Sequence, residues 1–100
     1  MVIADLQVLP NPLTNDPSAP YAFVDKAIAV IEQSGLKYQV GPLGTWVQGE
    51  LEAVLALVPA MTKAMRLAGA SKVITIIKIA DSGEESENPL AYMDKWLGKD

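Results

Sequence analysis

Residues 41–50 read GPLGTWVQGE and join two short runs of β-type sequence to the start of a helix. Three glycines, Gly41, Gly44 and Gly49, fall within this stretch. Because glycine allows a positive φ and a close approach of the backbone to another group, their spacing predicts a shaped hairpin whose second strand lies against something else. The stretch also concentrates an aromatic ring and polar side chains, so it is the first candidate for a binding site.

Alternating and helical periodicities on both sides of this hairpin define the other elements. Strands are predicted at 2–9, 36–40, 45–49 and 72–79, and helices at 21–34 and 50–68. Pro59 lies inside the second helical run and predicts a kink or a break near Val58. A proline-rich loop at 10–20 is longer than a minimal connection, and loops of this length often border binding sites.

The element order β-α-β-β-α-β spends roughly 40 residues on each half, as in a ferredoxin-like split βαβ plan. Asn88 followed by Pro89 predicts a further short helix that ends near Leu97. We therefore expect an α+β, ferredoxin-like βαββαβ sandwich with an added C-terminal helix. Residues 1–80 form the ligand-binding part, and residues 81–100 form the acidic loop and C-terminal helix of the same domain.

Both faces of the predicted strand at 72–79 are apolar. One face carries Val73, Thr75, Ile77 and Ile79, and the other carries Ile74 and Ile76. In a single sheet with helices on one side, the second face should be polar. The sequence therefore predicts a further cover, most simply the sheet of a second subunit, and hence a homo-oligomer.

Composition excludes several function classes. The chain has 100 residues, a net charge of −4 and neither cysteine nor histidine, which excludes a disulfide framework, thiolate chemistry and imidazole ligands. Residues 1–79 carry equal numbers of acids and bases, and the acidic excess lies in the tail, so no basic stripe favours nucleic acid. No apolar run approaches the ~18 residues of a membrane span, and the start lacks a basic signal region. We expect a cytoplasmic protein that binds neither nucleic acid nor membrane.

Polar residues on two strand faces leave two interpretations open. Asp5 and Gln7 alternate with apolar residues on the second face of the first strand, either as solvated side chains or as polar groups in a partly covered pocket. Trp46 and Gln48 share one face of the third strand. That face is either a solvent face with an interface tryptophan or the floor of a site.

Several segments in order resemble the YkoF-like thiamine-binding family. They are ADLQVLP at 4–10, YQVGPLGT at 38–45, VQGELEAV at 47–54, KVIT at 72–75 and IKI at 77–79. The resemblance covers about residues 1–80, and its most specific part is the Gly-Thr-x-x-x-Gly pattern that begins at Gly44. It implies ferredoxin-like subunits whose sheets pack face to face as dimers or tetramers. It also implies binding of thiamine or its hydroxymethylpyrimidine part, in salvage or transport, without catalysis or a separate cofactor.

The resemblance implies roles for residues near the hairpin. Trp46 or Tyr38 would stack on a ring, Gln48 would pair with the pyrimidine nitrogens, and Glu50 or Asp5 would offset the thiazolium charge. Gln7 and Thr45 complete the expected site, although Thr45 has an alternative role in the turn alone. Trp46 has an alternative role as an interface residue. Glu50 has an alternative role as a favourable carboxylate in the first turn of the helix.

Two departures from the family bear on the ligand. The family usually has Glu where this chain has Gln48, which both donates and accepts hydrogen bonds. The family's histidine in the second helix and its basic segment after the last strand are also missing. Two alternatives therefore stand beside a thiamine binder. One is a small dimeric α+β barrel-type enzyme that uses Asp5, Tyr38 or Glu50 on an apolar or aromatic substrate, and the other is a protein-interaction module that uses the acidic tail.

Overall fold

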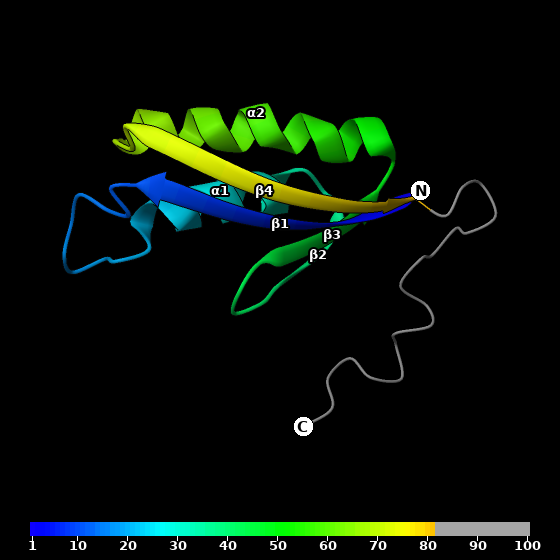
Figure 1. Cartoon of the computed structure of the whole chain (residues 1–100), viewed down its shortest axis with the longest axis horizontal. Helices are drawn as coiled ribbons and strands as arrows, with labels where there is room; N and C mark the ends of the chain where they lie inside the picture. Colours follow the sequence, from blue (N-terminus) through cyan, green and yellow to red (C-terminus); the bar gives the residue numbers. More distant parts are fainter. Residues whose placement is uncertain (82–100) are drawn as a thin grey trace, which may run out of the picture.

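A computed structural model describes residues 1–81 of the chain (Figure 1). Its elements are β1 (Val2–Asn11), α1 (Ala22–Gln33), β2 (Lys37–Val40), β3 (Thr45–Gly49), α2 (Leu51–Ala68) and β4 (Lys72–Asp81). The strands form one antiparallel sheet in the order β2-β3-β1-β4. This confirms the predicted ferredoxin-like βαββαβ fold. The helix predicted from Asn88 to Leu97 lies outside the described residues.

The register of β1 differs between its two neighbours. Against β4, the pairing runs over the whole strand, from Val2 opposite Asp81 to Asn11 opposite Lys72. Against β3, the pairing ends at Leu6 opposite Thr45. The second half of β1 therefore has a neighbouring strand on one side only, and Figure 1 shows β1 and β4 as a long pair that extends past the β2–β3 hairpin.

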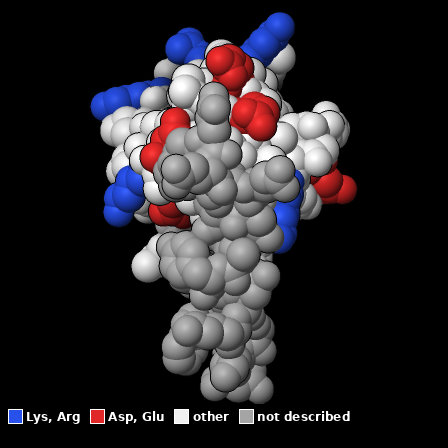
Figure 2. All heavy atoms as spheres, turned by 90° about the vertical axis from the view of Figure 1, so that its right-hand side faces the viewer, with Lys and Arg blue, Asp and Glu red and all other residues white. Residues whose placement is uncertain are grey.

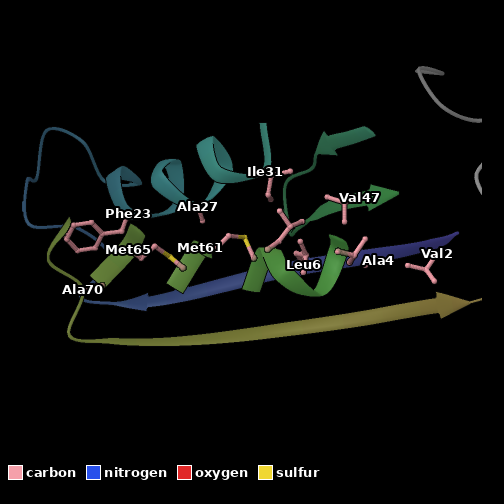
Figure 3. Packing of buried hydrophobic residues seen from close by; sticks show 12 residues of the cluster. Val2, Ala4, Leu6, Phe23, Ala27, Ile31, Val47, Met61, Met65 and Ala70 are labelled. Atoms are coloured by element: carbon pink, nitrogen blue, oxygen red, sulfur yellow. The ribbon is translucent and has the colours of Figure 1, made fainter. Parts of the chain in front are cut away.

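The core lies between one face of the sheet and both helices. Alternation along β1 buries every second residue, and the helices contribute residues at helical spacing. Figure 3 shows these side chains pointing toward one another from β1, β3, α1 and α2. The buried apolar residues are Val2, Ala4, Leu6, Phe23, Ala27, Ile31, Val47, Val54, Leu57, Met61, Met65 and Ala70. The predicted core face of the first strand is therefore confirmed.

Helix α2 continues through Pro59. The predicted break near Val58 is wrong. Proline removes only the hydrogen bond that its own N–H would donate to the Leu55 carbonyl. Pro59 and Leu55 lie on the exposed side of α2, while Leu57 and Met61 are buried in the core. Packing of the buried side therefore holds the helix together across the proline.

Charged side chains of both signs lie at the end of the molecule where the chain begins. Figure 2 shows acidic and basic side chains interspersed there. The only helices within residues 1–81, α1 and α2, are too short or too polar to cross a membrane. No set of three acidic side chains converges within the same residues as a metal site would require.

One buried hydroxyl in the core has no hydrogen-bond partner. Thr75 alternates with Ile74 and Ile76, so its side chain lies on the helix-covered face of β4, opposite Val8. Its Oγ1 is fully buried and makes no hydrogen bond within residues 1–81. A buried polar group without a partner loses its hydration and gains nothing in return.

We predict that Thr75→Val stabilises the protein by about 1 kcal/mol, because it replaces the unpartnered hydroxyl with a methyl group of similar size. Urea unfolding measures the change. Thr62→Val is the matched control, because the Thr62 hydroxyl donates a hydrogen bond of 2.9 Å to the Val58 carbonyl. A loss of stability in Thr75→Val, or an equal gain in both variants, would contradict the account.

Candidate functional site

A cavity of about 480 Å³ lies beside the part of β1 that follows Leu6, beyond its last pair with β3 at Thr45. We call it the edge cavity. Its walls come from the second half of β1, from α1, from the β2–β3 turn and from the loop that precedes α1. The lining residues are Leu6, Gln7, Val8, Leu9, Leu13, Tyr21, Val24, Asp25, Ala27, Ile28, Ile31, Val40, Gly41, Pro42, Leu43, Gly44, Thr45 and Met61. Its size falls in the range of small-molecule sites, about 300–1,000 Å³.

The β2–β3 turn forms one wall because it approaches β1 closely. The Gly41 N–H donates a hydrogen bond of 2.8 Å to the Gly44 carbonyl, which closes a turn around Pro42 and Leu43. A Cβ at Gly44 would lie 2.9 Å from an Asp5 carboxylate oxygen and 3.1 Å from the Leu6 carbonyl oxygen. A side chain here would crowd the Leu6 carbonyl and displace the Asp5 carboxylate, so glycine favours the close approach of the turn to β1.

The proline-rich loop contributes Leu13 to the cavity and is held by its own hydrogen bonds. The Thr14 hydroxyl donates to the Ala19 carbonyl at 2.8 Å, and the Asn15 side-chain amide donates to the Ala68 carbonyl at 3.3 Å. The Ser18 hydroxyl and N–H donate to the Asp16 carboxylate, and these hydrogen bonds lower the pKa of Asp16. The loop is thereby tied to itself and to the end of α2.

Within the edge cavity, apolar side chains form the floor and polar groups lie around them. The buried residues Ala27, Ile31 and Met61 line it from the core. Asp25 and Tyr21 are exposed, and Tyr21 keeps 61% of its surface accessible, so both lie at the mouth. No lysine or arginine is among the lining residues. Among described residues, the cavity therefore offers an apolar interior with an anionic carboxylate and an aromatic ring at its opening.

A second, shallower hollow of about 260 Å³ lies on the sheet face that the helices leave uncovered. We call it the sheet-face hollow. Asp5 stands between Trp46 of β3 and Lys78 of β4 in the strand register, and all three side chains line the hollow. Its polar groups include charges of both signs, and its walls are shorter than those of the edge cavity.

Gln48 lies on the same uncovered face, opposite Ile3 of β1 and Lys37 of β2. Its side chain is only 9% exposed. Its Nε2 lies 3.3 Å from the Met1 sulfur, and its Oε1 is buried without a hydrogen-bond partner among the described residues. A buried amide oxygen without a partner is rare in native proteins, so Gln48 has unused hydrogen-bonding capacity.

The site residues predicted from the sequence do not lie together in the structure. Gln7 and Thr45 line the edge cavity, and Asp5 and Trp46 line the sheet-face hollow. Tyr38 lies opposite Val47 in the register and packs against the core on the helix side. Tyr38 and Trp46 therefore lie on opposite faces of the sheet, so only one of the two could stack on a given ligand.

Glu50 lies at the start of α2, apart from both openings. It is the N-cap residue of the helix, and its side chain is 71% exposed, with Oε2 3.9 Å from the Met1 amino group. It lines neither the edge cavity nor the sheet-face hollow. This position fits its alternative role beside the first turn of a helix, where a carboxylate is favourable.

Sequence reasoning missed the residues on α1 that line the edge cavity. Asp25 and Tyr21 are one helical turn apart, and Ile28 follows Asp25 by three positions, so the spacing placed them on one side of the helix. Nothing in the spacing indicated that this side faces the β2–β3 turn. The length of the preceding loop was the available signal, because such loops often border sites.

An α+β sandwich with an apolar cavity and few polar groups has the form of a small-ligand-binding domain. The chain matches the model of the thiamine-binding protein family over residues 4–95. It therefore belongs to that family, as the sequence resemblance indicated.

The relatives share both sequence and fold. The UPF0045 protein CPE1503 of Clostridium perfringens is 38% identical over 94 residues, which cover 94% of this chain and 90% of that protein. The UPF0045 protein YqgV of Bacillus subtilis is 35% identical over 97% of this chain and 98% of its own. A Bacillus cereus structure, described as a domain of unknown function DUF77, superposes with a TM-score of 0.79 at 34% identity and covers 99% of this chain and 90% of that one.

A more distant structure shows the same fold. It comes from Thermotoga maritima and is described as a candidate thiamine biosynthesis or salvage protein. It superposes with a TM-score of 0.76 at 24% identity and covers 95% of this chain and 97% of that one. At 24% identity, this comparison shows only that the two proteins share the same arrangement of strands and helices.

Proposed function

We propose that this protein binds thiamine or a related hydroxymethylpyrimidine in the edge cavity, without catalysing a reaction. The observation that carries the proposal is the cavity of about 480 Å³ beside the second half of β1, which has apolar walls and few polar groups. Membership of the thiamine-binding protein family supports the choice of ligand. Salvage or transport of the vitamin is the role that such binding would serve.

The charges around the cavity suit a ligand with a positive end. Thiamine carries a permanent charge on its thiazolium ring, and Asp25 and Tyr21 lie at the mouth. A carboxylate attracts this charge, and a cation over a tyrosine ring gains about 0.5–2 kcal/mol. The neutral pyrimidine would then occupy the interior, where Gln7 and Thr45 supply polar contacts among apolar side chains.

The ionisable groups of the cavity favour binding over catalysis. A general acid or base must lie within hydrogen-bond reach of the reacting group of the bound substrate. In the edge cavity the ionisable lining residues are Asp25 and Tyr21, and both are exposed at the mouth. The enzyme alternative relied on Asp5, Tyr38 or Glu50, none of which lines this cavity.

We further propose that the uncovered sheet face packs against the same face of a second copy of the chain. The face carries large apolar side chains that remain exposed: Leu9 at 43%, Ile74 at 46% and Ile76 at 43%. Trp46 and Ile3 are part of the same face and are half-buried. Apolar surface of this kind marks an interface, and packing of two sheets would cover it.

We predict that thiamine raises the unfolding temperature of the protein saturably, because a ligand that binds only the folded state stabilises it by about 2.7 kcal/mol at 100 times its Kd. Ile28→Trp should weaken binding and reduce the shift, since the larger ring would occupy part of the edge cavity. Asp25→Lys should weaken binding by about tenfold or more, because a favourable charge becomes a repulsive one. Thermal-shift titration followed by calorimetry measures both effects.

Glu32→Gln is the matched control, because Glu32 is an exposed carboxylate on α1 that does not line the cavity. It should bind thiamine like the unaltered protein. If Trp46→Ala abolishes binding while Ile28→Trp retains it, the ligand lies in the sheet-face hollow and the edge-cavity proposal is wrong. If thiamine and the hydroxymethylpyrimidine both fail to shift the unaltered protein, the proposed function itself is wrong.

We predict that Ile76→Lys converts an oligomer into a smaller species, because it places a charge within the proposed sheet–sheet interface. Sedimentation equilibrium gives the mass of each variant. The control is Leu67→Lys, a substitution of a 78% exposed apolar residue on α2. A monomeric unaltered protein, or equal dissociation in both variants, would contradict the interface.

A further inference from the structure

Val8 presents its backbone polar groups to the edge cavity. In an antiparallel sheet, the N–H and C=O of one residue point to the same neighbouring strand, and those of the next residue point to the other. The Gly41 N–H donates to the Gly44 carbonyl, so Gly44 points toward β2 and Thr45 points toward β1. Thr45 lies opposite Leu6, which therefore points toward β3, and so does Val8 two residues later.

A hydrogen bond at the far end of β1 gives the same result independently. The Ser71 N–H donates to the Asn11 carbonyl at 2.9 Å, so Asn11 points toward the β4 side. Val8 is three residues away and must point to the other side. The β1–β3 ladder ends at Leu6, so within residues 1–81 no strand lies opposite Val8 there. What lies there is the edge cavity, which Val8 lines.

In an extended residue, the N–H donor and the C=O acceptor lie side by side and point the same way. A 4-aminopyrimidine presents the complementary pair on one edge, a ring nitrogen that accepts beside an amino group that donates. Since buried backbone groups are almost always hydrogen-bonded, a ligand that enters the cavity must satisfy this pair. The Val8 N–H and C=O can bond to these two groups when the pyrimidine ring lies in the plane of the sheet. The ring would then occupy the place beside Val8 that a longer β3 would fill.

We infer that the main chain of Val8 reads the aminopyrimidine edge of the ligand by two parallel hydrogen bonds, an inference that rests on the proposed function. The Val8 side chain is half-buried and packs against the core, so it holds the backbone in place without making the polar contacts. Selectivity for the amino group then requires neither Gln48 nor the carboxylate that the family usually has at that position.

The test compares thiamine with oxythiamine, in which a ring carbonyl replaces the 4-amino group. The ring carbonyl of oxythiamine would place an acceptor against the Val8 carbonyl, where thiamine places an amino donor. Oxythiamine should therefore bind at least about tenfold more weakly than thiamine, as measured by calorimetry. Amide hydrogen exchange by NMR provides the second readout. Thiamine should slow exchange at Val8 and leave Leu6, already paired with β3, unchanged.

Each outcome decides between the proposals. Weaker oxythiamine binding together with protection of the Val8 amide supports the inference. Equal binding of the two compounds, or thiamine binding that leaves exchange at Val8 unchanged, overturns the role of Val8 and leaves the proposed function standing. Absence of binding by thiamine and by the hydroxymethylpyrimidine overturns both.

Discussion

The structure depends on a mismatch in length between β1 and the strand beside it. β1 pairs with β4 along its full length but with β3 only as far as Leu6. The N–H and C=O groups of a strand edge cannot be buried without hydrogen-bond partners. This edge must therefore either stay accessible to water or bond to another partner. The edge cavity is the first of these solutions, and a bound ligand would be the second. The β2–β3 turn and the proline-rich loop fix the width of the opening.

The two faces of the sheet differ in what covers them. The helix-covered face contains the densely packed core of Val2, Ala4 and Leu6 with Phe23 and Met61 of the helices (Figure 3). The other face keeps apolar side chains at the surface and holds the unpartnered amide oxygen of Gln48. In our proposal the edge cavity binds the ligand and the uncovered face binds a second subunit. Each function then uses polar groups that have no hydrogen-bond partner within residues 1–81.

Much of the fold could be predicted because it follows local periodicity. Alternation identified the buried face of β1, and Gly44 marked the turn that lies against Asp5. The break at Pro59 was wrongly predicted, because a local rule was applied where core packing around Leu57 is stronger.

The site was harder to predict than the fold. Gln7 and Thr45, which line the edge cavity, were among the predicted residues. Asp25 and Tyr21 were not, because their approach to the hairpin depends on how α1 lies across the sheet. The orientation of the Val8 backbone was also hidden. It depends on where the pairing with β3 stops, which no pattern within β1 reveals.

The measurement that tests the central claim most directly is a crystal structure of the protein grown with thiamine. The account predicts ligand density beside Val8, between the β2–β3 turn and α1, with the thiazolium ring at the mouth near Asp25 and Tyr21. Density confined to the uncovered sheet face beside Trp46 and Gln48 would contradict it and would return the site to the residues first predicted from the sequence.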